Sequence, residues 1–232
     1  MKLKVADLVV EIEVEGDLLL SRVEPYVCDD NEKADIIFNV SKQYYIDRRE
    51  EHKNLSLAET EYLWSGSFFY EQLAEYDGLM LHASCVEYEG KAYLFSARSG
   101  TGKSTHTHLW LKHLPGSRII NDDKPAIRIV NGEFYAYGTP WSGKTNESVN
   151  TGVPIAGIAF LSRGENSIKR IPGIKALKPF MDQTVRPFDK KLMGKMLETL
   201  NMVLTQVPIY ELTCDMSEDA VKTAFNGMKD GD

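Results

Sequence analysis

The sequence predicts an α/β domain built on a mixed β-sheet, and three observations support this. The glycine-rich segment Ser99–Thr105 follows the apolar run Lys91–Ser96 and leads into a helix-like stretch. Pairs of β-like runs flank the dipeptides Glu89-Gly90 and Asn131-Gly132, which is typical of hairpins. The near-continuous apolar run Val153–Leu161 predicts a strand that is buried on both faces.

The N-terminal quarter of the chain has a different pattern. Leu8–Val14 and Asp35–Val40 predict short strands that are separated by acidic, turn-prone segments. The charged stretch Lys42–Lys53 is expected to form a solvated surface. We therefore expect a small β-rich extension over residues 1–66 and the main α/β domain over residues 67–232.

The main domain is expected to begin with a helix at Ser67–Tyr76, which Asp77-Gly78 ends. A strand at Asn166–Ile171 is expected to neighbour the buried run Val153–Leu161. The other predicted strands are Leu79–Glu87, Lys91–Ser96, Ser117–Asn121, Ala126–Val130, Glu133–Tyr137 and Pro208–Leu212. Predicted helices follow Lys103, span Phe188–Leu204 and span Ser217–Met228.

Composition excludes several classes of function. With 43% hydrophobic and 26% charged residues in 232, the chain is expected to be a soluble globular protein, and no apolar run approaches the ~20 residues that cross a bilayer. An acid close to Met1 argues against a secretory signal, so the expected location is the cytoplasm. The net charge of −7, without a Lys/Arg-rich run, argues against binding nucleic acid. Oligomeric state is left open, with a homo-oligomer among the alternatives.

The three cysteines, Cys28, Cys85 and Cys214, lie far apart in the chain. Their odd number and wide spacing suggest neither a disulfide framework nor a metal site. We expect them to be reduced packing residues.

The central motif is the loop that ends in Gly102-Lys103-Ser104. It fits the phosphate-binding pattern G-x-x-x-x-G-K-[ST] except at Ala97, where the pattern has glycine. Glycines at positions 100 and 102 let backbone N–H groups surround phosphate oxygens, while Lys103 adds positive charge and Ser104 offers a hydroxyl to Mg²⁺. The predicted nucleotide-binding residues are Ser99, Gly100, Thr101, Gly102, Lys103, Ser104 and Thr105.

Together with this loop, His82 and the pair Asp122-Asp123 resemble the catalytic domain of HPr kinase/phosphorylase, which shares its P-loop fold with the phosphoenolpyruvate carboxykinases. The resemblance extends over Gly78–Pro125 and more loosely to Leu212. It implies a mixed-sheet fold of that type, the use of ATP and Mg²⁺, and transfer of the γ-phosphoryl group to a hydroxyl. The chain departs from the family at Gly138–Lys144, where the family has a glycine/arginine signature.

The resemblance also implies roles for individual residues. Asp122 is the expected base, and Asp123 is expected to hold Mg²⁺ together with Ser104. His82 would bind the γ-phosphate or assist the base. Arg98 and Lys144 are candidates for stabilising the transferred charge or for binding an anionic group of the substrate.

The acceptor is not identified by the sequence. A peptide or protein serine and a small hydroxy compound are both possible acceptors, and the Thr139–Lys144 segment is expected to select among them. There, Trp141 could stack on adenine or cover the acceptor, although an aromatic residue beside proline more often packs in the core, and Lys144 would pair with an anionic group. Two alternatives stay open: a carboxykinase-like lyase that acts on a small dicarboxylate, and a non-catalytic nucleotide-binding sensor in which Ala97 marks a degenerate loop.

Overall fold

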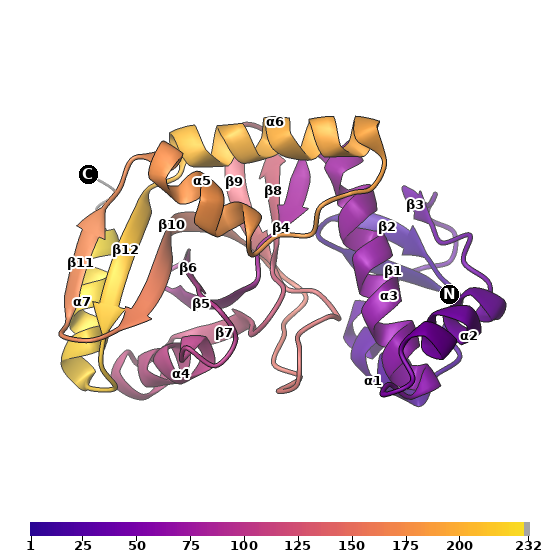
Figure 1. Ribbon diagram of the computed structural model, residues 1–232, viewed down its shortest axis with the longest axis horizontal. Coiled ribbons are helices and arrows are strands. Elements are labelled where there is room, and N and C mark those ends of the chain that lie inside the picture. The colour runs from indigo at the N-terminus through magenta and orange to yellow at the C-terminus, as the bar shows by residue number, and fades with distance from the viewer. Residues whose placement is uncertain (230–232) are drawn as a thin grey trace.

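The structure, a computed structural model, describes residues 1–229. Its N-terminal part contains a three-stranded sheet in the order β1-β2-β3, at the right of Figure 1. The elements of this part are β1 (Lys2–Val5), β2 (Leu8–Glu11), α1 (Asp17–Val23), the 3-10 helix η1 (Glu24–Tyr26), β3 (Ile36–Ile37) and α2 (Lys42–Glu51). The expected extension therefore contains more helix than strand, and its charged stretch is the helix α2.

A nine-stranded mixed sheet forms the centre of the molecule. Its main path is β4-β8-β9-β10-β6-β5-β7, and β12 pairs with both β10 and β11. The strands are β4 (Gly78–Met80), β5 (Ala83–Tyr88), β6 (Lys91–Ser96), β7 (Arg118–Asn121), β8 (Ala126–Val130), β9 (Glu133–Tyr137), β10 (Gly152–Arg163), β11 (Ser167–Arg170) and β12 (Ile209–Cys214). The predicted mixed α/β architecture is confirmed.

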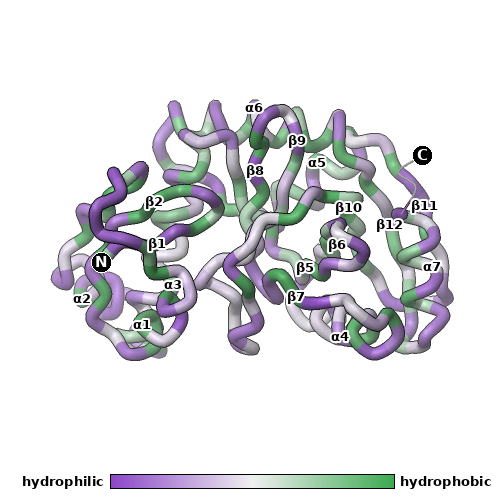
Figure 2. The backbone as a smooth tube through the Cα atoms, turned by 180° about the vertical axis from the view of Figure 1, so that it is seen from behind, coloured by the Kyte–Doolittle hydropathy of each residue, from purple (hydrophilic) through white to green (hydrophobic). Residues whose placement is uncertain are grey.

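Strand β10 belongs to both halves of this sheet. Residues 152–154 pair with β9 in antiparallel register, and residues from Ile155 onward pair in parallel with β6 and then also with β12. The long apolar run explains this position, because a strand with neighbours on both sides and helices on both faces has no solvated side. Seen from behind in Figure 2, β10 and β2 are among the hydrophobic stretches of the backbone.

Helices cover both faces of the main sheet. Met196, Leu200 and Val203 of α6 pack with Leu94 and Ile120 on one face. On the other face, α4 and α7 pack on the strands. Helix α6, on the first face, runs along the top of Figure 1. The helices are α3 (Leu57–Gln72), the 3-10 helix η2 (Leu73–Tyr76), α4 (Lys103–His113), α5 (Gly173–Met181), α6 (Lys190–Gln206) and α7 (Glu218–Met228).

Both predicted hairpins are confirmed. Strands β5 and β6 pair around Glu89 and Gly90, and β8 and β9 pair around Asn131 and Gly132. All four turn residues have positive φ, between 52° and 83°, as a two-residue type I′ turn requires.

Three expectations about elements were wrong. The predicted strand Leu79–Glu87 is interrupted at Leu81 and His82, and its two pieces, β4 and β5, pair with different neighbours. Strand β11 pairs with β12 rather than with β10, because β12 occupies that side of β10. The helix expected at Ser67–Tyr76 starts earlier, at Leu57, where a capping box between Ser56 and Glu59 fixes its first turn.

The boundary expected between residues 66 and 67 falls inside α3, which continues across it without a break. A single hydrophobic cluster includes Leu3 and Val10 from the N-terminal part together with Tyr137 and Trp141 from the main sheet. The N-terminal part is thus packed into the same core as the sheet. Among residues 1–229 no helix is long and apolar enough to cross a membrane.

Candidate functional site

The sheet topology brings three separate segments to one edge. Strands β6 and β7 each pair antiparallel with β5, so they run parallel to one another and their carboxyl ends lie on the same side. The glycine loop, defined here as residues 97–102, follows β6, and Asp122 and Asp123 follow β7. His82 immediately precedes β5 and therefore lies at this same edge. Carboxyl ends of parallel strands are the usual ligand-binding edge of an α/β sheet.

A cavity of about 410 Å³ lies at this edge, and we call it the phosphate cavity. It is lined by His82, Ser99, Gly100, Gly102, Lys103, Ser104, Thr105, Asp122, Asp123, Gly143, Lys144, Thr145 and Arg163. Most of the predicted site residues are therefore brought together. Thr101 and Arg98 are not among the residues that line it; Arg98 is exposed, and its charge is one of those that lower the pKa of the Asp182 carboxyl, after the Lys178 hydrogen bond.

The glycine loop has the conformation that an anion site needs. Gly100 and Gly102 have φ of 78° and 123°, which side-chain-bearing residues rarely adopt, and the space where a Cβ would stand is open. Ala97 is not among the residues with positive φ, so its methyl group causes no strain there. Helix α4 starts at Lys103 without a side-chain cap, so its positive end is available to an anion.

Lys103 is buried, and its Nζ donates a hydrogen bond to the Ala97 carbonyl oxygen at 3.0 Å. Burial lowers the pKa of its ammonium group, while the charges of Asp123 and Asp122 oppose that shift. The lysine is thus held across its own loop, close to both carboxylates.

Asp122 is almost fully buried, and both of its oxygens accept hydrogen bonds from hydroxyl groups. Ser84 Oγ donates to Oδ1 at 2.5 Å, and Thr145 Oγ1 donates to Oδ2 at 3.0 Å. Ser84 comes from β5, while Thr145 comes from the long segment that connects β9 and β10 and hangs below the sheet in Figure 1. These contacts fix the carboxylate at the wall of the phosphate cavity.

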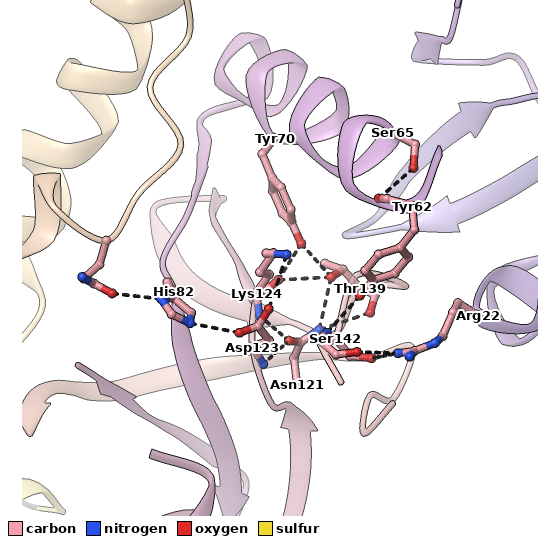
Figure 3. Close-up of polar contacts among 12 residues, drawn as sticks. Arg22, Tyr62, Ser65, Tyr70, His82, Asn121, Asp123, Lys124, Thr139 and Ser142 are labelled. Atoms are coloured by element: carbon pink, nitrogen blue, oxygen red, sulfur yellow. Dashed lines mark hydrogen bonds and ion pairs between the residues drawn. The ribbon is translucent and has the colours of Figure 1, made fainter. Parts of the chain in front are cut away.

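Asp123 instead pairs with His82. Its Oδ1 lies 3.0 Å from His82 Nε2, and its Oδ2 lies 3.3 Å from Lys124 Nζ. Burial raises the pKa of the Asp123 carboxyl, but the His82 hydrogen bond and the Lys124 charge together outweigh burial and lower it. His82 Nδ1 is 2.9 Å from Gln183 Oε1, so Gln183 orients the ring. Figure 3 shows His82 and Asp123 turned toward one another.

The turn that contains both carboxylates is held by Asn121, which is fully buried. Its Oδ1 accepts from the backbone N–H groups of Asp123 at 3.0 Å and Lys124 at 2.7 Å, and its Nδ2 donates to Thr139. Tyr70 of α3 donates to the Lys124 carbonyl oxygen at 2.6 Å (Figure 3). Sequence reasoning missed this clamp, although asparagine at a strand end is a known turn former.

Arg163 was also missed. It ends β10, which is parallel to β6, and its guanidinium donates to the carbonyl oxygens of Thr101 at 2.8 Å and Gly100 at 2.6 Å. The sequence signal that could have identified Arg163 as a site residue is its position at the end of the long apolar run. It adds a cation to the phosphate cavity and fixes the conformation of the loop.

A second cavity of about 500 Å³, which we call the β12 cavity, lies on the β10 and β12 side of the glycine loop. Its lining includes Thr101 and Gly102 of the glycine loop. The other lining residues are Thr105, His106, Leu109, Leu161, Arg163, Gly164, Cys214, Asp215 and Met216. Trp110 Nε1 donates to His106 Nε2 at 3.1 Å, so neutral His106 carries its proton on Nδ1, facing Cys214 Sγ. Burial lowers the pKa of His106 to about 4.

Trp141 does not lie in either cavity. It is fully buried, stacks on Phe69 with ring centroids 4.9 Å apart, and donates from Nε1 to Ser65 Oγ at 3.0 Å. Of the roles expected for Trp141, packing in the core is confirmed, and stacking on adenine or covering an acceptor is wrong.

Comparisons with known proteins give little further information. No protein-family model and no curated protein matches the chain. Among solved structures, the Hpr(Ser) kinase/phosphatase from Coxiella burnetii is similar, with a TM-score of 0.37 and 10% identity over 65% of this chain and 93% of that chain. This is a distant relationship of fold.

Proposed function

We propose that the protein is a Mg²⁺-dependent kinase that transfers the γ-phosphoryl group of ATP to a hydroxyl group. The observation that supports this most directly is the phosphate cavity itself. It combines an uncapped helix N-terminus, three cations (Lys103, Lys144 and Arg163) and two carboxylates in one space. Phosphoryl transfer needs these components, because catalysis consists mainly of positioning and charge stabilisation.

The side chains present fit Mg²⁺. Within residues 1–229, no group of three or more His, Cys, Asp or Glu side chains could hold a metal ion without other ligands. Magnesium with nucleotides usually takes one or two carboxylates and completes its shell with phosphate oxygens and water. Ser104 and Asp122 offer hydroxyl and carboxylate oxygens for this purpose in the phosphate cavity. The ion would neutralise charge on the β- and γ-phosphates.

The contacts favour an exchange of the two roles expected for the aspartates. Asp122 is buried, and both of its oxygens are held by hydroxyl groups, as suits a carboxylate that holds a metal ion. Asp123 lines the phosphate cavity and contacts His82. We assign the proton transfer to the His82–Asp123 pair. The acceptor oxygen forms a bond to the γ-phosphorus, the bond to the β–γ bridging oxygen breaks with its electron pair leaving on ADP, and the hydroxyl proton passes to the Asp123 carboxylate, which His82 holds in place.

The two cavities also define an orientation for ATP. The β12 cavity has apolar walls from Leu109, Leu161 and Met216, which suits a base. Asp123 lines the phosphate cavity, on the other side of the glycine loop. We place the base there and the γ-phosphate beside Asp123. Lys103 and Arg163 would then exchange their loop carbonyl contacts for phosphate oxygens.

Titration calorimetry with Mg-ATP, followed by ³¹P NMR of the products, tests this function. The Lys103→Met substitution should weaken ATP binding at least tenfold, since a charge-assisted hydrogen bond contributes roughly 1.5–3 kcal/mol. Lys112→Met, at an exposed position of the same helix, is the matched control and should bind ATP as the wild type does. Equal ATP affinities for the Lys103→Met and wild-type proteins, or binding without transfer to any hydroxyl, would refute the proposal.

A further inference from the structure

A third cavity lies beside helix α3 and reaches Lys124, the residue that follows Asp123. It has a volume of about 290 Å³ and is lined by Leu63, Trp64, Gly66, Ser67, Tyr70, Lys124 and Val185. Five of these residues come from α3, so we call it the α3 cavity.

One ion pair lies between the α3 cavity and the phosphate cavity. Lys124 lines the α3 cavity, Asp123 lines the phosphate cavity, and Lys124 Nζ lies 3.3 Å from Asp123 Oδ2. Tyr70, another wall residue, holds the Lys124 carbonyl oxygen at 2.6 Å. A molecule that binds Lys124 in the α3 cavity is therefore separated from the Asp123 carboxylate by that one side chain, and the ATP orientation proposed above puts the γ-phosphate beside Asp123 in the phosphate cavity.

The lining of the α3 cavity indicates what it would bind. Leu63, Trp64 and Val185 give apolar surface, and Lys124 is the one charged side chain among the lining residues that the structure describes. The other cations near the reacting groups, Lys103, Lys144 and Arg163, line the phosphate cavity and are needed for the phosphates. An anionic group of the acceptor thus has Lys124 as its available partner, since an ammonium has three N–H donors and Asp123 occupies one.

We propose that the α3 cavity is the acceptor site, and that the acceptor is a small molecule with a hydroxyl, a nearby carboxylate and an apolar body. This inference rests on the proposed kinase function. The carboxylate pairs with Lys124, the apolar part packs against Leu63 and Trp64, and the hydroxyl is presented to Asp123. The volume is at the lower limit of the ~300–1,000 Å³ usual for small-molecule sites, which favours a single small compound over a protein segment.

The first test compares acceptors in the presence of Mg-ATP with ³¹P NMR detection. Phenyllactate has all three features, lactate lacks the apolar body, and phenyllactate methyl ester lacks the charge. We expect kcat/KM for phenyllactate to exceed that for either other compound at least tenfold. Faster phosphorylation of the methyl ester, or of an uncharged serine tripeptide, would overturn the inference while leaving the kinase function standing.

Variants test the location of the site. Ser67→Phe fills the exposed end of the cavity from α3, and Lys124→Met removes its charge; each should raise KM for phenyllactate at least tenfold with ATP affinity within about threefold of wild type. Ser21→Phe, an exposed serine on α1, is the matched control and should not change KM. An unchanged KM in both cavity variants would refute the location.

Binding without turnover separates this inference from the kinase proposal. Of the three tryptophans, Trp110 and Trp141 are fully buried, whereas Trp64 is partly exposed in the cavity wall. Phenyllactate should change the intrinsic fluorescence of the wild-type protein even without ATP, and Trp64→Phe should abolish the change. Saturable binding that Lys124→Met weakens would support the acceptor site even if no phosphate is transferred. A fluorescence change that persists in Trp64→Phe would contradict it.

Discussion

Asp122 and Asp123 are adjacent in the chain but have different partners, and this difference can be measured. Asp123→Asn should reduce phosphoryl transfer at least a hundredfold with Mg-ATP binding nearly unchanged, because the amide cannot accept the hydroxyl proton. Asp122→Asn should instead raise the Mg²⁺ concentration needed for half-maximal activity about tenfold or more. Steady-state kinetics at varied Mg²⁺ decides between them, with exposed Asp219→Asn as control. The opposite pattern would restore the assignment expected from the sequence.

The buried His106 is expected to make the free energy of unfolding depend on pH in the acid range. Its folded-state pKa is about 4, below the ordinary value of 6.5, because burial disfavours the charged ring. Between those values the unfolded chain binds more protons than the folded one, so the contribution is complete above pH 6.5 and is lost as the pH falls toward 4. The loss amounts to about 3 kcal/mol, at ~1.36 kcal/mol for each pKa unit.

Urea unfolding at several pH values between 4 and 7 measures this contribution. The free energy of unfolding should fall less steeply on acidification in His106→Gln than in the wild type, because glutamine does not titrate. Parallel pH profiles for the two proteins would show that burial of His106 does not control acid stability.

The site residues that could be predicted from the sequence are those that belong to a local motif. Gly100, Gly102, Lys103 and Ser104 follow a fixed spacing, and the structure places them around one cavity. Asn121 and Arg163 act through loops that are distant in the chain, so no local spacing reveals them. The role of Trp141 was left open between packing and a site for the same reason, since its burial depends on α3.

At the level of elements, helix α3 links the N-terminal part to the site, and its start depends on a capping box. Ser56 Oγ accepts from the Glu59 N–H at 3.2 Å, and the Glu59 carboxylate accepts from the Ser56 N–H at 2.8 Å. Ser56→Ala should lower the free energy of unfolding by about 1 kcal/mol.

Ser41 supplies the matched control for that substitution. It stands at the N-cap of α2, yet its side chain makes no capping hydrogen bond. Ser41→Ala should therefore cost less than about 0.5 kcal/mol in the same chemical denaturation experiment. Equal losses for the two substitutions would mean that the capping box of α3 contributes nothing.

Elements were predicted well where their signal is local. The hairpins at Glu89-Gly90 and Asn131-Gly132 follow from turn chemistry, and both formed as expected. The break at His82 and the pairing of β11 with β12 depend on which strand lies alongside, which a single run of residues does not specify. The mixed sheet was thus predictable, and its strand order was not.

At the scale of the whole molecule, Trp141 connects the N-terminal part to the main sheet within one hydrophobic cluster. We therefore expect a single cooperative thermal transition by calorimetry, with no separate melting of residues 1–66. Trp141→Ala should lower the free energy of unfolding by roughly 3–5 kcal/mol and keep one transition. Two resolved transitions in the wild type would show that the parts unfold independently.

The continuity of β10 limits how the two halves of the sheet can move relative to one another. One twelve-residue strand is shared by the β9 side and by the β6 and β12 side, so strand pairing with one register shift, between Ile155 and Gly157, joins the two halves of the sheet in place of a flexible linker. Closing around substrates by a rigid rotation of one half against the other would require this strand to bend and lose its pairing. Whatever displacement accompanies a reaction cycle is therefore confined to the connecting segments at the sheet's edge, chiefly residues 97–102 and 138–151.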